Sequence, residues 1–189
     1  MSHRLFLALE LPADIRSLVG DLVSKDQLQT LPVKWEPLDK LHLTLNFAGR
    51  VSDQTATLLR RRLEKIIPSI PAFQLRLLFL ECLYRRHGDS LIYLAPAGDL
   101  DSLKDLQHRL AQLLATELQI PQPHRFLPHV LIGHPQKSDP PTIKRLLDQI
   151  TAVDFTPTPY FPITGITLFE SHLSRSGSFH QKIGHFALK

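Results

Sequence analysis

Cysteine is almost missing from this chain, which has only Cys82 among its 189 residues. A single cysteine excludes an intramolecular disulfide and a cysteine-rich metal site, and it favours a reducing compartment. Long apolar runs are missing too, because no stretch reaches the ~20 residues of a membrane span. The early run LFLAL is too short for a signal peptide and is closed by Glu10 and Pro12. We therefore expect a cytoplasmic protein that makes no use of a membrane.

A strong excess of charge is also missing. The formal net charge is +4 and the isoelectric point is near 9.4, a mild basic balance that is consistent with an anionic partner without identifying one. Hydrophobic residues make up 43% of the chain. A chain of this length and composition can bury a sizeable core, either as one large domain or as two small lobes that pack closely.

The spacing of apolar residues predicts alternating strands and helices. Strands are expected over residues 4–11, 39–49, 72–81, 90–96, 126–134, 163–171 and 180–189, and helices over residues 12–23, 52–67, 99–119 and 140–150. Ser52 and Asp99 are expected as helix N-caps, and Gly88 with Asp89 as a turn.

These elements fall into two similar halves, over residues 4–81 and 90–171, with 180–189 as a closing strand. Leu5 precedes His42 by 37 residues, and Ile92 precedes His129 by the same interval. The repeat predicts a single α+β domain, residues 1–189, with two pseudo-symmetric lobes of antiparallel sheet flanked by helices. The two histidine-bearing strands would then meet at an active-site groove between the lobes.

The run KLHLTLNF, residues 40–47, contains polar residues at alternating positions of an apolar strand. Because side chains of a strand alternate between its faces, His42, Thr44 and Asn46 are expected on the face opposite the core. A lone His-x-Thr pair of this kind is most often solvated. A second histidine at the equivalent position, His129, favours a functional site.

Two histidines can share acid and base roles, because the ordinary imidazole pKa of ~6.5 lies near neutrality. At a phosphodiester, a neutral imidazole takes a proton from attacking water while an imidazolium protonates the departing oxygen. A hydroxyl on the same strand face, such as that of Thr44, can donate to a non-bridging phosphate oxygen. This chemistry requires no metal and no cofactor, and we expect none.

Several segments resemble the 2H phosphoesterases, and among them the RNA 2′,3′-cyclic phosphodiesterases once described as 2′-5′ RNA ligases. The similar segments are RLFLALELP, KLHLTLNFAG after Trp35, RFLPHVLIG, and LFESHLSRSG followed by a phenylalanine. The first His-x-Thr-x motif is intact at His42 and Thr44, and the resemblance spans nearly the whole chain. It implies hydrolysis of cyclic phosphate ends of RNA or of cyclic nucleotides.

The second motif departs from the family pattern, because Leu131 stands where a second threonine is expected. His134 stands where an arginine is usual, and His180 where a tyrosine is common. A guanidinium binds phosphate oxygens bidentately and stays charged at any working pH, so its replacement is expected to weaken binding.

The resemblance implies that His42 is the proton donor and His129 the proton acceptor, although the sequence alone does not decide which role each takes. Further residues are candidates for substrate binding: Thr44, the Leu131 position, His134, Arg125 or its neighbour His124, and Arg4 for phosphate, with Phe47 or Trp35 for a base. Solvated loop cations and, for Phe47, core packing are the competing interpretations.

Two other functions compete with the enzyme. The degraded second motif fits a protein that binds a nucleotide or RNA end with little turnover. The spacing of His124, His129 and His134 suggests a metalloprotein, but five-residue spacing alternates strand faces and disfavours convergence on one ion. For the enzyme as for the alternatives, we expect a monomer with no obligatory protein partner.

Overall fold

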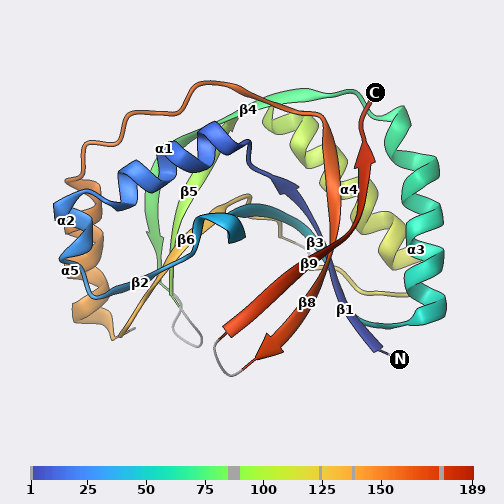
Figure 1. The fold of residues 1–189 in the computed structure, drawn as a ribbon, viewed down its shortest axis with the longest axis horizontal. Helices are drawn as coiled ribbons and strands as arrows, with labels where there is room; N and C mark the ends of the chain where they lie inside the picture. Colours follow the sequence, from blue (N-terminus) through green and yellow to red (C-terminus); the bar gives the residue numbers. More distant parts are fainter. Residues whose placement is uncertain (1, 85–89, 124, 138, 175–176) are drawn as a thin grey trace.

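The computed structural model describes residues 2–84, 90–123, 125–137, 139–174 and 177–189. One curled, largely antiparallel sheet runs through the molecule in the order β7-β4-β5-β6-β3-β1-β8-β9, and β2 pairs with β6 outside this path (Figure 1). The order is symmetric about the central β6–β3 pair: β5 and then β4 lie outside β6, and β1 and then β8 lie outside β3. The expected α+β class with two lobes of antiparallel sheet is therefore confirmed.

The strands are β1 (Ser2–Glu10), β2 (Val33–Trp35), β3 (His42–Ser52), β4 (Phe73–Leu83), β5 (Leu91–Gly98), β6 (Val130–Pro135), β7 (Phe161–Ile163), β8 (Gly165–Ser174) and β9 (Gly177–Ala187). The helices are α1 (Ala13–Val23), α2 (Asp26–Gln29), α3 (Asp53–Ile66), α4 (Leu100–Glu117) and α5 (Pro140–Thr151), with 3₁₀ turns η1 (Leu38–Lys40) and η2 (Ile67–Ser69).

Each helix and strand expected from the sequence is present, but the strand expected over 126–134 begins only at Val130. The elements α2, β2 and β7 were not predicted, since three or four residues are too few to show a period. Ser52 caps α3 by accepting a hydrogen bond from the Thr55 amide, as expected. Asp99 instead accepts one from the Gln74 amide of β4. The turn expected at residues 88–89 lies outside the described residues.

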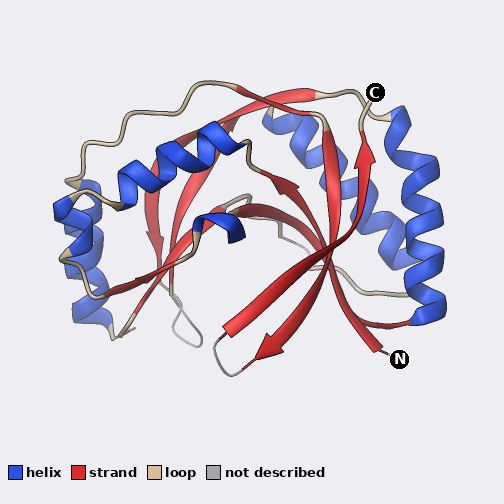
Figure 2. Ribbon diagram, in the orientation of Figure 1, coloured by secondary structure: helices blue, strands red, loops and turns tan. Residues whose placement is uncertain are grey.

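The helices lie outside the curl of the sheet, with α1, α2 and α5 at one end and α3 and α4 at the other (Figure 2). Their apolar faces join the sheet in one large core, to which β1 contributes alternate residues Leu5, Leu7 and Leu9. The intervening Phe6 and Ala8 point to the other face, where they form a small separate cluster with Phe169 of β8. None of the helices in the described ranges is long and apolar enough to cross a bilayer.

Irregularities in β3 change which side chains share a face. Its pairing with β1 skips one residue at Leu45 and one at Ala48. Each extra residue reverses the alternation that follows it. Asn46 therefore points into the core, where its amide lies 3.0 Å from that of Gln122, whereas Phe47 emerges beside Phe6. The prediction that Asn46 shares a face with His42 was wrong.

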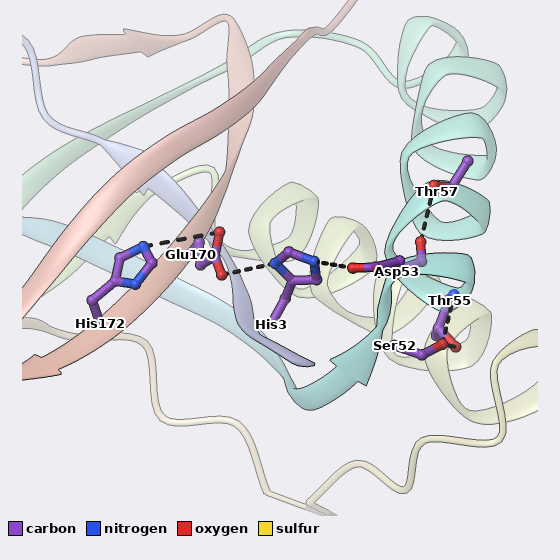
Figure 3. Close-up of polar contacts among 7 residues, drawn as sticks. All are labelled: His3, Ser52, Asp53, Thr55, Thr57, Glu170 and His172. Carbon is purple, nitrogen blue, oxygen red and sulfur yellow. Dashed lines mark hydrogen bonds and ion pairs between the residues drawn. The ribbon is translucent and has the colours of Figure 1, made fainter. Parts of the chain in front are cut away.

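His3 of β1 connects three elements of the fold (Figure 3). Its Nδ1 lies 2.8 Å from a carboxylate oxygen of Glu170 on β8, and its Nε2 lies 2.6 Å from Asp53 at the start of α3. His172 approaches the other Glu170 oxygen at 3.9 Å. The hydrogen bonds with Glu170 and Asp53 raise the pKa of His3, because both ring nitrogens can donate only when the ring is protonated.

Candidate active site

A cavity of about 550 Å³ lies where the two halves of the sheet meet. Both histidines that the sequence singles out, His42 and His129, line it. The lining also includes Arg4, Phe6, Glu36, Lys40, Thr44, Phe47, Leu131, His134 and His180. The expected groove is present, and it brings together most of the candidate residues.

The two histidines come from neighbouring strands of the same sheet. Leu43 of β3 pairs with Val130 of β6 in antiparallel register. Antiparallel pairing about this point places Thr44 opposite His129 and Leu131 opposite His42. The two motifs therefore lie side by side on adjacent strands, centred on the Leu43–Val130 pair. His129 itself precedes the first residue of β6.

Both imidazoles are held in the same way. Nδ1 of His42 lies 2.6 Å from the Lys40 carbonyl oxygen, and Nδ1 of His129 lies 2.8 Å from the Leu127 carbonyl oxygen. A carbonyl only accepts hydrogen bonds, so each Nδ1 carries a proton and donates it. In a neutral ring this leaves Nε2 as the basic nitrogen. The matching bonds give the two histidines the same tautomer.

The hydroxyl of Thr44 lies 3.1 Å from Nε2 of His42. It is therefore beside the nitrogen that would exchange a proton, and it can donate to an anion at the same point. Leu131 lines the cavity at the corresponding position of β6, where it offers only methyl groups. The hydroxyl is present on one strand and missing on the other.

The surroundings of the two imidazoles differ. The His42 ring lies 5.2 Å from Phe6, 6.0 Å from Phe169 and 5.6 Å from His180, measured between ring centroids. Burial among these rings lowers the pKa of His42 to about 4; the bond to the Lys40 carbonyl opposes this shift, and charge on His180 would add to it. His42 is therefore neutral at pH 7 in the free protein.

His129 packs edge-on against Tyr93 of β5, with 5.7 Å between ring centroids. The Tyr93 hydroxyl donates a hydrogen bond to Glu81 of β4. Burial and this bond raise the pKa of Tyr93 to about 12, so the phenol keeps its proton and its link to Glu81. The bond to Glu81 thus fixes the Tyr93 ring against which His129 packs, and neither residue was predicted from the sequence.

Two further predicted residues line the same cavity. His134 has Nε2 3.6 Å from a carboxylate oxygen of Glu36, and its buried Nδ1 finds no hydrogen-bond partner among the described residues. Phe47 is 59% exposed and contacts Phe6. The expectation that Phe47 packs in the core was therefore wrong, and the bulges in β3 explain why its ring emerges.

The remaining candidates differ in their placement. Arg125 is exposed and is not among the residues that line the cavity, a placement that fits a solvated cation. His124 lies outside the described residues. Trp35 packs on the core beside Gly133, where an added Cβ would lie 2.9 Å from its ring. Arg4 does line the cavity and supplies a permanent cation.

His180 is the main lining residue that the sequence did not select for the site. It lies opposite Ser171 in the β8–β9 hairpin, and its ring contacts both Phe6 and His42. Burial lowers the pKa of His180, and the positive charge of Lys40 adds to this. Only the departure from the family's tyrosine pointed to it in the sequence.

A metal site of the kind the histidine spacing suggested is not found in the part of the chain that the structure describes. Within it, no group of three or more histidine, cysteine, aspartate or glutamate side chains is arranged to hold an ion.

The fold and the groove define an α+β protein with two imidazoles directed to one cavity, and comparison with known proteins places it in a family. The model of the 2′-5′ RNA ligase superfamily matches residues 12–175. The chain belongs to this superfamily, the 2H phosphoesterases, as the sequence motifs indicated.

Relatives cover most of the chain at low identity. The RNA 2′,3′-cyclic phosphodiesterases of Thermotoga maritima and Aquifex aeolicus are each 23% identical over 171 residues, which cover 85% and 90% of this chain and 90% and 89% of the relatives. The structure of E. coli LigT complexed with 3′-AMP superimposes with a TM-score of 0.77 at 24% identity, covering 100% of this chain and 99% of LigT. The Thermus thermophilus protein TT0787 gives a TM-score of 0.69 at 22% identity, covering 98% and 97%.

Proposed function

We propose that this protein hydrolyses the 2′,3′-cyclic phosphate ends of RNA or of nucleotides to 2′-phosphomonoesters, without a metal or cofactor. The observation that carries the proposal is the pair His42 and His129, which line one cavity with both Nδ1 atoms bonded to backbone carbonyls. The T. maritima and A. aeolicus relatives, which are RNA 2′,3′-cyclic phosphodiesterases, support it.

In the proposed reaction, neutral His129 accepts a proton at Nε2 from a water molecule whose oxygen attacks phosphorus. The bond between phosphorus and the 3′ oxygen breaks, and protonated His42 gives its Nε2 proton to that oxygen. The product keeps the phosphate on the 2′ oxygen. The proton gained by His129 and the proton lost by His42 then exchange with solvent.

The acid role of His42 depends on the substrate, since this ring is neutral in the free protein at pH 7. A phosphate anion about 4 Å from Nε2 interacts with an imidazolium by roughly 4 kcal/mol at an effective dielectric constant of about 20. That energy would raise the pKa of His42 by about three. Substrate binding would therefore offset the effect of burial and load His42 with a proton.

Other lining groups take supporting roles in the proposal. The Thr44 hydroxyl donates to a non-bridging phosphate oxygen, the Arg4 guanidinium adds a permanent positive charge to the cavity, and the His134 imidazole offers a further polar contact. Phe47 offers an exposed aromatic face to the terminal base.

The direct test uses purified protein, a 2′,3′-cyclic nucleotide and EDTA. We expect turnover that EDTA does not affect, with a bell-shaped dependence on pH, and its loss in both His42→Ala and His129→Ala. Arg125→Ala is the matched control, because this exposed cation lies outside the cavity. Full activity in either histidine variant, with circular dichroism like that of the wild type, would refute the mechanism.

A binding protein with a degenerate site is the second candidate, and Leu131 favours it. Isothermal titration with a 2′-phosphonucleotide at pH 5.5, in buffers of different ionisation enthalpy, measures proton uptake. We expect uptake of close to one proton, which falls in His42→Ala. Binding without turnover after overnight incubation would support the second candidate, whereas turnover that depends on His42 rejects it.

A further inference from the structure

A second hollow, of about 510 Å³, adjoins the candidate active site. Lys40, His42 and His180 line both spaces. The hollow therefore begins at the candidate proton donor and extends away from His129, which lines only the first cavity. A ligand longer than one nucleotide that fills the active site has a continuous path into it.

The hollow combines cations with apolar surface. Arg16 of α1, Lys40 of η1 and Lys182 of β9 line it, together with the carboxylates of Glu10 and Asp39. One guanidinium nitrogen of Arg16 donates to the Leu11 carbonyl oxygen at 2.5 Å, which fixes this side chain at the edge of the hollow. Lys182 pairs with Glu10, so that the net positive charge comes from Arg16 and Lys40 against Asp39.

An aromatic side chain completes the hollow. Phe179 of β9 lines it and is 60% exposed, an unusual exposure for a phenylalanine. Its ring stacks on that of His172, its partner in the β8–β9 pairing, with 6.0 Å between centroids and 27° between the ring planes. A half-open aromatic ring beside cations is the arrangement with which proteins hold single-stranded nucleic acid, by stacking a base and pairing its phosphate.

We propose that this hollow binds the nucleotide preceding the cyclic-phosphate end of an RNA strand, with its base on Phe179 and its phosphate near Arg16. The inference rests on the proposed function and deepens it, because it makes an oligoribonucleotide, and not a free cyclic nucleotide, the better substrate.

The test compares two substrates, a 2′,3′-cyclic mononucleotide and a trinucleotide that ends in the same cyclic phosphate. We expect a higher kcat/KM for the trinucleotide. Phe179→Ala should reduce it roughly 5- to 150-fold, the range expected for loss of one stacked base, and should change the mononucleotide value less than twofold. Phe79→Ala is the matched control, because Phe79 is 55% exposed on β4 but lines neither space.

Binding gives a second readout that needs no turnover. Fluorescence anisotropy of a trinucleotide ending in a 2′-phosphate should show weaker binding in Phe179→Ala, and a smaller salt dependence in Arg16→Ala. Equal kcat/KM for the two substrates, or equal effects of Phe179→Ala on both, would overturn the inference and leave the proposed function intact. If the wild type turns over neither substrate, the proposed function is refuted. The anisotropy measurement would then show whether the hollow still binds RNA through Phe179.

Discussion

Restoring the missing hydroxyl with Leu131→Thr provides the sharpest prediction for the active site. Leu131 lines the cavity opposite His42, as Thr44 lies opposite His129 across the same strand pair. Threonine suits a strand position, and its hydroxyl would enter the cavity where the leucine methyl groups now lie. A hydrogen bond to a charged group contributes about 1.5 to 3 kcal/mol, and 1.36 kcal/mol corresponds to tenfold in rate. We therefore expect kcat/KM to rise roughly 10- to 150-fold.

The assay is kcat/KM on a 2′,3′-cyclic nucleotide at constant pH, with Leu131→Val as the matched control. Valine removes nearly the same volume and is also β-branched, but it brings no hydroxyl. We expect the valine variant to stay within about threefold of the wild type, so that the difference between the two variants isolates the hydrogen bond. Equal rates in the two variants would show that no phosphate oxygen lies within reach of position 131, and the proposed substrate geometry would be wrong.

Two predictions concern stability. The pKa of His3 is raised above its ordinary value of about 6.5, so its bonds to Glu170 and Asp53 stabilise the fold fully below about pH 6.5 and are lost as pH rises through the raised pKa. Thermal unfolding should show His3→Gln less stable than the wild type at pH 6 and nearly equal to it at pH 9. A difference in stability that does not depend on pH would contradict this. Asn46→Leu should lower the free energy of unfolding by about 1 to 3 kcal/mol, because the Gln122 amide loses its buried partner. Tm should fall by roughly 2 to 12 °C with kcat unchanged, whereas a loss of kcat at unchanged Tm would place Asn46 in the groove after all.

The regular parts of this fold could be predicted from the sequence, because they depend on the period and spacing of apolar residues. Alternation around His42 predicted that Thr44 shares its face, and the equal intervals to His42 and His129 predicted neighbouring strands. The first prediction depends on the local geometry that a strand imposes on its residues, and the second depends on the repeated order of elements in the two halves. The α+β class and the groove between two lobes followed from the same pattern.

The parts that the sequence did not predict depend on irregular or distant contacts. An extra residue at Leu45 leaves no mark in composition, yet it turns Asn46 inward and, with a second bulge, brings Phe47 to the groove. His180 reaches the site only because β9 folds back along β8, far from either histidine motif in the chain. The support of His129 by Tyr93 similarly depends on the pairing of two strands.

The pairing of Leu43 with Val130 has a consequence for how such an enzyme can diversify. Backbone hydrogen bonds between adjacent strands fix the spacing of the two motifs, so opening or closing of the outer ends of the molecule would leave the reacting geometry nearly untouched. Side chains at the rim of the groove can then be exchanged without moving the two motifs relative to each other.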